Sequence, residues 1–239
     1  MPSYGLGSLW RRVEDALRGL IPVYDKVNRI ISLGQDLKLR RLAVAKAIRG
    51  RGLLVLDAGC GPGTMSKIID STNCVKQIVL LDPLKEMLKQ SKQRLGDNRS
   101  AFVQAVFEYL PFKDGVFDVV VSAFALRDAF NLTAALAELN RVVKTRGVVL
   151  ILDLGKPDSK LLQAAIGVYW RILAPLLASA YIGKEGLLYR LLYHTYIKLP
   201  TNTHLKKMAE KLFGYVDLNE KMMGGVIILL AVKQHPHPL

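Results

Sequence analysis

Three glycines at alternate positions, directly after a carboxylate, form the stretch of this sequence best suited to chemistry. Residues 53–56 are four consecutive aliphatic residues, a pattern typical of a strand buried on both faces. Asp57 follows, and Gly59, Gly61 and Gly63 then alternate through a predicted tight turn. Glycine tolerates positive φ and lets another molecule approach the backbone closely. Strand, glycine turn and helix together predict a nucleotide-sized pocket at the carboxyl edge of a parallel sheet.

A second carboxylate stands where a ribose would need one. Residues 77–82 read as another buried strand, which ends in Asp82, 23 residues after Gly59. A carboxylate there can accept two hydrogen bonds from a cis-diol. A dinucleotide fingerprint would need glycine at the sixth position of the turn, which is Thr64 here. The arrangement instead resembles motif I of the class I S-adenosylmethionine (SAM) methyltransferases, although a glycine turn that serves only strand–helix packing stays an alternative.

The resemblance to this motif implies a SAM site along the carboxyl ends of the strands. Met87, five places after Asp82, would lie near the adenine or serve only as a core residue. Val106 stands where many SAM enzymes have a polar side chain for the adenine amine, so adenine contacts would come from backbone groups and apolar packing. The residues expected at the cofactor are Asp57, Gly59, Cys60, Gly61, Gly63, Asp82, Pro83, Met87, Val106, Phe107, Ser122 and Ala123.

A stretch near the N-terminus carries a more specific resemblance. Residues 24–34 read Tyr-Asp-Lys-Val-Asn-Arg-Ile-Ile-Ser-Leu-Gly. They resemble the signature Y-D-x-M-N-x-x-x-S-x-G of the UbiE/MenG family, the methyltransferases of ubiquinone and menaquinone biosynthesis. Val27 replaces the usual methionine. The match then fades, with Asp36 where the family usually has histidine and Leu39 where it has tryptophan.

Three later stretches continue this resemblance. Residues 107–112 resemble the family's A-E-x-L-P-F loop, and residues 124–128 resemble F-G-L-R-N, with Asp128 in place of asparagine. Residues 141–147 resemble R-V-L-K-P-G-G and keep the final glycine. The resemblance extends from about residue 22 to residue 233, so it covers nearly the whole chain.

Members of this family transfer a methyl group from SAM to a ring carbon of a polyprenylated quinol, and the resemblance implies the same reaction here. Deprotonating a quinol hydroxyl makes the adjacent carbon nucleophilic, so the site must hold carbon and methyl about 3 Å apart and accept a proton. Arg127 is expected to stabilise the phenolate or to orient a water, with an ion pair to Asp128 as the alternative. The candidate bases are Asp25, Asp128 and His194, and the candidate substrate contacts are Tyr24 and Asn28. No metal is expected.

The length and composition indicate one folded domain. At 239 residues the chain can bury a full core, and 51% hydrophobic with 23% charged residues excludes a disordered chain. We expect a single methyltransferase domain over 1–239, with an N-terminal helical segment at 1–50 and an apolar helical cap at 158–200. Two cysteines give neither a disulfide framework nor a metal-ligand spacing. Together with the lack of a predicted signal peptide, they fit a cytoplasmic protein.

The net charge of +14 is unevenly distributed. Residues 11–51 carry a net charge of +7 and residues 141–211 carry +8, whereas residues 57–140, which contain the expected cofactor site, carry −1. Basic flanks favour an anionic partner such as acidic lipid headgroups or a nucleic acid. Solubility or ion-pair networks are the alternative explanation.

The pattern along the chain predicts an α/β fold with a Rossmann-like, seven-stranded, mostly parallel sheet of the class I SAM methyltransferase type. N-terminal helices precede the sheet, and a helical cap is inserted near 158–200. The expected strands are 53–56, 77–82, 101–106, 117–123, 148–154, 215–221 and 226–233, the last two forming a hairpin. The expected helices include 8–20, 36–49, 133–143 and 203–213. The tail from Gln234 onward, with His235 and His237, is expected to be disordered.

The segment 161–200 is unusually apolar. Residues 161–182 contain one charge, Arg171, and are long enough to span a membrane. Against a span, Arg171 at the midpoint would cost ~2.5–3.5 kcal/mol, and Gly167 and Pro175 interrupt the run. We therefore expect cap helices over the carboxyl edge of the sheet, with a second helix at 184–194. They would form an apolar channel or a membrane-facing surface.

The expected partners follow from these features. They are a lipophilic quinol and an anionic membrane surface, contacted peripherally at the inner face of the membrane. The oligomeric state stays open, and a dimer is one outcome. An RNA methyltransferase is disfavoured by the apolar 161–200 segment and by the lack of a basic-aromatic strip. A non-catalytic subunit is disfavoured by the intact glycine turn and Asp82, while methylation of another lipid or small molecule stays open.

Overall fold

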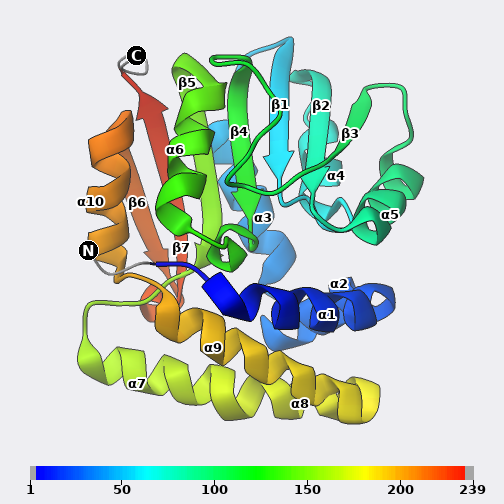
Figure 1. Ribbon diagram of the computed structural model, residues 1–239, viewed down its shortest axis with the longest axis vertical. Coiled ribbons are helices and arrows are strands. Elements are labelled where there is room, and N and C mark those ends of the chain that lie inside the picture. Colours follow the sequence, from blue (N-terminus) through cyan, green and yellow to red (C-terminus); the bar gives the residue numbers. More distant parts are fainter. Residues whose placement is uncertain (1–3, 235–239) are drawn as a thin grey trace.

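The computed structural model describes residues 4–234, which form one seven-stranded sheet covered by helices on both faces and at one edge (Figure 1). Strands β1 to β5 run parallel, and β7 is antiparallel to both of its neighbours, β5 and β6. The strands, in their order across the sheet, are β3 (Ser100–Gln104), β2 (Val75–Asp82), β1 (Leu53–Ala58), β4 (Phe117–Ala123), β5 (Val143–Leu154), β7 (Val226–Lys233) and β6 (Gly214–Lys221). The predicted fold class is confirmed.

The strands are apolar because both faces of the sheet are buried. Successive residues of β1 alternate between two cores: Val55 packs with helices on one face and Leu56 with helices on the other. The face that contains Leu56 is covered by α6 (Leu132–Val142) and α10 (Asn202–Phe213). The opposite face is covered by α3 (Asp36–Ala47), α4 (Thr64–Asp70) and α5 (Lys85–Leu95).

The order of strands places a switch point between β1 and β4. The chain moves outward from β1 through β2 to β3 and then returns to pair β4 with the other side of β1. In open α/β sheets, ligands bind at such a point, beyond the carboxyl ends of the strands. The register aligns these ends, because Asp57 lies opposite Leu80 of β2 and Val121 of β4.

The N-terminal helices and an internal helical segment between β5 and α10 cover this carboxyl edge (Figure 1). Helices α1 (Trp10–Leu20) and α2 (Tyr24–Ile31) come from the N-terminal segment. The cap consists of α7 (Lys160–Val168), a π-helical turn (Tyr169–Leu173), α8 (Ala174–Ile182), a 3-10 segment (Gly183–Arg190) and α9 (Leu191–Lys198). Pro175 does not break the cap helix, because it lies in the first turn of α8, directly after the π turn.

The predicted second cap helix at 184–194 is wrong in its first half. Gly183, with φ of 73°, ends α8, and the chain reverses there. Gly186 then packs so closely on α8 that a Cβ atom would lie 2.2 Å from the Ser179 nitrogen. This close approach gives 3-10 geometry up to Arg190, and α-helical geometry resumes at Leu191.

The boundaries of other elements differ from the predicted ones by a few residues. Strand β3 ends at Gln104 and not at residue 106, because the following residues turn away from the sheet. Strand β5 begins at Val143, five residues before the predicted start, and carries a register irregularity opposite Phe117–Val119. The β6–β7 hairpin is confirmed. Of the tail predicted to be disordered, residues 235–239 lie outside the described residues.

One helical run, Lys160–Lys198, is long and apolar enough to cross a membrane by length and composition alone. Within this run, the reversal at Gly183 produces two arms that pack against each other. Tyr169 also bonds its hydroxyl to the Ile31 carbonyl at 2.5 Å, which ties the first arm to α2. The cap is therefore packed against the N-terminal helices as a hairpin.

Candidate active site

The three glycines of the turn after β1 all have positive φ, but they do different things. A Cβ on Gly59 would lie 2.4 Å from the Ala125 Cβ, and one on Gly63 would lie 3.0 Å from the Ser91 Cβ. These two glycines allow close packing of the turn. A Cβ on Gly61 would meet nothing within 4 Å, and Gly61 faces a cavity. Gly61 therefore leaves the backbone open to a ligand.

Asp82 is held at the end of β2 by two backbone groups. Its Oδ2 accepts a hydrogen bond from the Gly61 nitrogen at 2.9 Å, and its Oδ1 accepts one from the Leu84 nitrogen at 2.9 Å. Burial raises the pKa of Asp82 to about 6. Each carboxylate oxygen has a further lone pair, and Asp82 lines the same cavity as Gly61. The carboxylate is thus oriented as an acceptor for ligand hydroxyls.

Asp57 lies beneath the turn and does not line the cavity. It is fully buried, and its Oδ2 accepts a hydrogen bond from the Ser66 hydroxyl. Its Oδ1 has no hydrogen-bond partner within residues 4–234. Burial raises the pKa of Asp57 to about 6. An acceptor left open at this depth fits a site completed by a bound group or a water.

The first cavity has a volume of about 540 Å³, within the range of small-molecule sites. Seven of the predicted cofactor residues line it: Gly59, Gly61, Asp82, Pro83, Met87, Val106 and Phe107. The other five predicted residues do not, namely Asp57, Cys60, Gly63, Ser122 and Ala123. Cys60, Ser122 and Ala123 are buried at the ends of β1 and β4, so their side chains support the turn and the strand.

One wall of this cavity was not expected from the sequence. Trp10 and Leu17 reach it from α1, a segment predicted only as a helix at 8–20. The segment after η3 (Leu126–Asp128) contributes Phe130 and Asn131. The other missed lining residues are Leu84, Glu108, Tyr109, Phe124, Ala125, Ala129 and Ala134. No motif marks this set, because the wall forms only when α1 folds over the edge of the sheet.

A second, mostly apolar cavity of about 330 Å³ adjoins the first. Tyr24 and Phe124 line both cavities, so these two side chains form the boundary. Phe124 has φ of 57°, a rare conformation for an aromatic residue. The Arg40 guanidinium stacks 5.0 Å from the centre of its ring, and Arg40 itself is ion-paired to Asp36 at 2.9 Å. Arg40 and Asp36, which are not part of the glycine motif, thus hold Phe124 at the boundary between the two cavities.

Arg127 lines the second cavity and is held by two carboxylates. Its NH1 lies 3.2 Å from Asp153 Oδ1, and its NH2 lies 3.4 Å from Asp128 Oδ2. The same side chain donates to the Phe124 carbonyl. Its Nε has no acceptor in the described part of the chain. The predicted alternative, an ion pair with Asp128, is therefore present, and one N–H donor is left over.

Asp128, the neighbour of Arg127 in sequence, lines the first cavity. Burial raises the pKa of Asp128 to about 6, although the Arg127 guanidinium opposes the shift. Its Oδ1 has no hydrogen-bond partner among the described residues. The Tyr24 hydroxyl interacts electrostatically with Arg127 and Asp128, and burial raises its pKa. A cation, an open carboxylate oxygen and a protonated phenol therefore converge where the cavities meet.

The other predicted site residues are distributed unevenly. Asn28 lines the second cavity. Asp25 lies outside both cavities: it pairs with Arg94 at 2.6 Å and accepts from the Thr64 hydroxyl at 2.7 Å, which ties α2 to α4 and α5. His194 is exposed on α9, beside Tyr193, and also lies outside both. Neither Asp25 nor His194 is placed to act as a base at this site.

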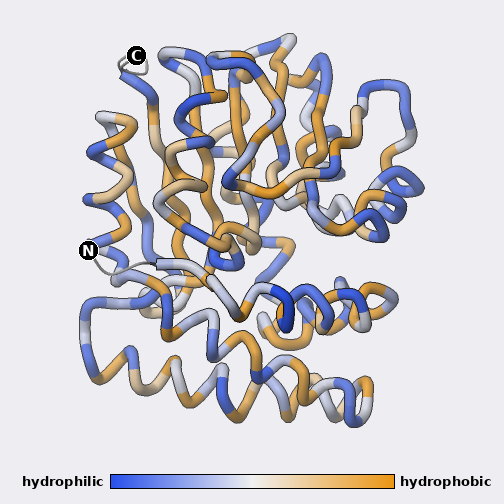
Figure 2. The backbone as a smooth tube through the Cα atoms, in the orientation of Figure 1, coloured by the Kyte–Doolittle hydropathy of each residue, from blue (hydrophilic) through white to orange (hydrophobic). Residues whose placement is uncertain are grey.

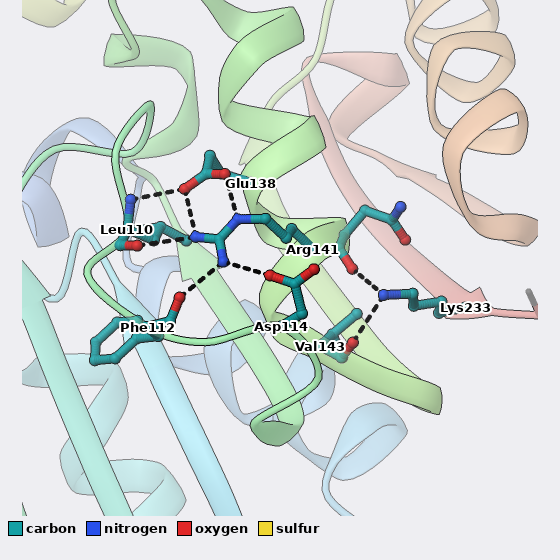
Figure 3. A network of polar contacts seen from close by, with 8 residues as sticks. Leu110, Phe112, Asp114, Glu138, Arg141, Val143 and Lys233 are labelled. Atoms are coloured by element: carbon teal, nitrogen blue, oxygen red, sulfur yellow. Dashed lines mark hydrogen bonds and ion pairs between the residues drawn. The ribbon is translucent and has the colours of Figure 1, made fainter. Parts of the chain in front are cut away.

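The loop between β3 and β4 is fixed by the network in Figure 3. The Arg141 guanidinium donates to the Leu110 carbonyl at 2.9 Å and to the Phe112 carbonyl at 2.7 Å, and it pairs with Glu138 and Asp114. This network positions the residues just before Leu110, which line the first cavity. The family-like stretches at 107–112 and 141–147 thus include residues that hold a wall of the cavity.

Comparison with known proteins places the chain among methyltransferases. The ubiE/COQ5 methyltransferase family matches residues 8–233. The chain is 32% identical over 232 residues to the ubiquinone/menaquinone biosynthesis C-methyltransferase UbiE of Pseudomonas putida, covering 93% of this chain and 89% of the relative. It is 31% identical over 215 residues to the UbiE protein of Shewanella pealeana, which covers 86% of this chain and 84% of that relative.

Solved structures share the fold at lower identity. The complex between the Haloferax volcanii Trm112 methyltransferase activator and the putative methyltransferase matches with a TM-score of 0.66 and 15% identity, covering 92% of this chain and 98% of that chain. The CurJ carbon methyltransferase matches with a TM-score of 0.58 and 15% identity, covering 80% of this chain and 51% of that chain. At this identity the likeness supports the class I SAM methyltransferase fold.

Proposed function

Because the chain belongs to the ubiE/COQ5 methyltransferase family, we propose that it transfers a methyl group from SAM to a ring carbon of a polyprenylated quinol. The observation that carries this proposal is the pair of adjoining cavities. One follows the glycine turn and Asp82, the other is mostly apolar, and Tyr24 and Phe124 border both. A donor and a lipophilic acceptor bound in them would meet at these two side chains.

The residues of the first cavity fit SAM, which supplies an electrophilic methyl group when it is bound. Asp82 would bind the ribose hydroxyls, since two backbone N–H groups already orient its carboxylate. The open Gly61 backbone admits the ligand, and the free Asp57 Oδ1 can accept a hydrogen bond beneath the turn. Met87 and Val106 supply apolar contacts suited to an adenine ring. Ser122, Ala123, Cys60 and Gly63 would act by shaping this turn.

The second cavity fits a ring with an apolar tail. Its side chains with polar groups are Tyr24, Asn28, Ser32, Asp36, Arg127, Tyr169 and Trp170. The remaining lining is mostly aliphatic and aromatic, and it comes from α2, α3, the cap and the turn before β7. We place the quinol ring beside Tyr24 and Arg127, because these residues also border or adjoin the cofactor cavity.

Two residues would handle the charge and the proton. Arg127 would stabilise the phenolate, because its guanidinium is fixed by Asp153 and keeps a free Nε donor. Asp128 would accept the proton, because its Oδ1 is open and a pKa of about 6 leaves the carboxylate ionised at neutral pH. Tyr24, kept protonated by burial, would donate a hydrogen bond to a quinol oxygen.

We also propose that the enzyme binds peripherally to an anionic membrane at its cytoplasmic face. A polyprenylated quinol is taken up from the bilayer, and the cap exposes the apolar surface that this requires. The exposed side chains of the cap include Leu161, Val168, Ile172, Leu173, Leu176, Tyr181, Leu187, Leu188 and Ile197. The basic segments 11–51 and 141–211 would add electrostatic attraction.

A transfer assay tests the proposed function. The protein is incubated with SAM labelled in its methyl group, together with either a membrane lipid extract or total RNA. We expect label in a quinone fraction of the lipid, identified by mass spectrometry. Label in RNA, or in a lipid without a quinone ring, would contradict the proposed substrate while leaving the SAM-dependent activity in place.

A further inference from the structure

The turn that joins β6 to β7 holds two methionines in an unfavourable backbone conformation. Met222 and Met223 have φ of 51° and 56°, a region that glycine and asparagine adopt far more readily. Both side chains are exposed, at 41% and 74%, and both residues line the second cavity. Two consecutive residues of this type therefore present large apolar side chains at a solvent-facing wall.

The surrounding structure enforces this conformation. Asn202 donates from Nδ2 to the Gly224 carbonyl at 3.0 Å and to Glu220 Oε1 at 2.8 Å. The Gly225 nitrogen bonds back to the Met222 carbonyl at 3.0 Å, and the Gly155 nitrogen bonds to the Gly225 carbonyl at 2.9 Å. Strained positions of this kind persist where the fold over-determines them, and they cluster at functional sites.

Positive φ at non-glycine residues is concentrated around the same cavity. Between residues 4 and 234, six non-glycine residues have positive φ, and four of them line the second cavity: Leu33, Phe124, Met222 and Met223. Phe124 lies at the boundary with the first cavity. Leu33 has φ of 51° and is 60% exposed, and Met222 and Met223 likewise combine positive φ with exposure. The second cavity therefore has Phe124 at its inner end and exposed apolar side chains at its outer end.

We propose that Leu33, Met222 and Met223 form the exit by which the substrate's isoprenoid tail leaves the second cavity, and that they give the enzyme its preference for long tails. This inference rests on the proposed function. A cavity of about 330 Å³ is near the lower end of ligand sites, so a ring at Tyr24 leaves little room for a long chain. Methionine adapts its shape to apolar ligands, which suits a tail of repeating units.

The exit faces the apolar part of the cap. Leu162 and Ile166 of α7 line the same cavity as the methionines, and the Ile166 Cδ1 lies 3.1 Å from the position of a Cβ on Gly225. Leu161, the neighbour of Leu162, is among the most exposed apolar residues of the described chain. A tail that leaves between the turn and α7 would therefore pass directly onto the surface assigned to the membrane.

Chain-length selectivity in detergent tests this exit. The variants are Met222→Asn with Met223→Asn, and Leu33→Asn, because asparagine tolerates the left-handed conformation and lacks the apolar side chain. With a long-tailed quinol we expect kcat/KM to fall about tenfold, as several buried methylene contacts would predict. With a quinol that carries one isoprene unit we expect less than about a twofold change on the same scale. The Tm should stay level or rise, since strain is relieved.

Tyr215→Asn is the matched control, because Tyr215 is 55% exposed, between the values of Met222 and Met223, but lies at the start of β6, the end of that strand remote from the turn. It should leave the preference for long tails unchanged. Equal losses on both quinols in the methionine double variant would overturn the proposal, since they would indicate a general structural role. An unchanged preference for long tails in every variant would overturn it as well.

A binding readout separates this proposal from the proposed function. The chain has two tryptophans: Trp10 lines the first cavity and Trp170 the second. In a Trp10→Phe protein, emission from Trp170 should respond to a ring-less polyprenol, and the double methionine change should weaken that response about tenfold. If quinols are not methylated but the polyprenol effect persists, the exit stands and the proposed substrate fails. If quinols are methylated and the methionines do not affect polyprenol binding, the exit fails alone.

Discussion

The two cavities are built in different ways. The first follows the loops after β1, β2, β3 and β4, with one wall from α1, and its key carboxylate is held by the Gly61 and Leu84 backbone nitrogens. The second takes Phe124 and Arg127 from the segment after β4 and Leu154 from β5. The rest of its lining comes from α2, α3, α7, the π turn, α9 and the turn before β7, which are far apart in the sequence. Figure 2 shows hydrophobic residues running through the strands and continuing along the cap helices. A local motif thus fixes the cofactor side, whereas tertiary packing forms the substrate side.

This difference predicts that binding and turnover can be separated by mutation. Changes at the first cavity should weaken SAM binding, and changes at the second should impair turnover or selectivity while SAM still binds. Asp82 and Arg127 are the sharpest test, because Asp82 lines the first cavity and Arg127 lines the second. Asp128 lines the first cavity but is paired with Arg127 where the cavities meet, so its change should impair turnover.

The largest effect is expected for Arg127→Ala. Turnover should fall at least ~10²-fold, because electrostatic help to the phenolate is lost, while SAM affinity measured by calorimetry stays near wild type. The unpaired Asp153 would also cost about 3–5 kcal/mol of stability. Arg127→Lys keeps a charge beside Asp153 and should be better folded yet still slow. A folded Arg127→Ala protein with wild-type turnover would remove Arg127 from the chemistry.

Asp128→Asn should lower turnover by about 10² above pH 6, because the proton acceptor is lost. In the wild type, kcat/KM should rise as pH increases through about 6, and the variant should lack this rise. An unchanged pH profile in the variant would assign the proton to another acceptor.

The same substitution should affect stability in a pH-dependent way. The pKa of Asp128 is raised in the folded protein, so ionising the buried carboxyl destabilises the fold as pH rises from about 4 to above 6. Asparagine removes this penalty, and the free energy of unfolding should increase by up to ~3 kcal/mol at pH 7.5 but hardly at pH 4. Thermal melts at the two pH values measure the difference. A variant less stable at pH 7.5 would mean that the Arg127 ion pair outweighs the burial of Asp128.

Asp82→Ala should weaken SAM binding by one to two orders of magnitude, the loss of a charge-assisted hydrogen bond at ~1.5–3 kcal/mol. Calorimetry on the folded variant measures this loss. Asp70→Ala is the control, since Asp70 forms an exposed ion pair with Arg99 away from both cavities. Unchanged affinity in Asp82→Ala would mean that the first cavity does not hold the ribose as proposed.

The smallest effect is expected at the cap surface. Leu173→Gln with Leu176→Gln should reduce sedimentation with anionic phosphatidylglycerol vesicles several-fold, and high salt should weaken binding of the wild type, because electrostatic attraction is screened. Tyr215→Gln, at the far edge of the sheet, should bind like wild type. Salt-independent binding that survives an alkaline wash would instead indicate an inserted cap.

The part of the first cavity formed by the ends of β1 and β2 could be predicted from sequence, because strand ends and glycine turns have local signatures, whereas the wall contributed by α1 could not. Gly59, Gly61 and Asp82 line the cavity, as expected of cofactor residues, whereas Asp57, which was expected at the cofactor as well, is buried and does not line it. The second cavity could be predicted only in part. Tyr24, Asn28 and Arg127 line it and were expected at the substrate, but no local pattern shows that Phe124 takes positive φ or that Met222 lies beside α7. Tertiary contacts also decide the position of two candidate bases: Asp25 and His194 are suitable residue types, but both lie outside the two cavities.

The central claim is that a methyl group is transferred to a ring carbon of the quinol where the two cavities meet. The position of the methyl group in the product tests this claim most directly. A demethylated, polyprenylated quinol is incubated with methyl-labelled SAM and the purified protein in detergent, and the product is analysed by NMR. We predict label in a methyl group bonded to a ring carbon adjacent to a hydroxyl-bearing carbon. Label in a methyl ether on oxygen, or no label in the quinol at all, would contradict it.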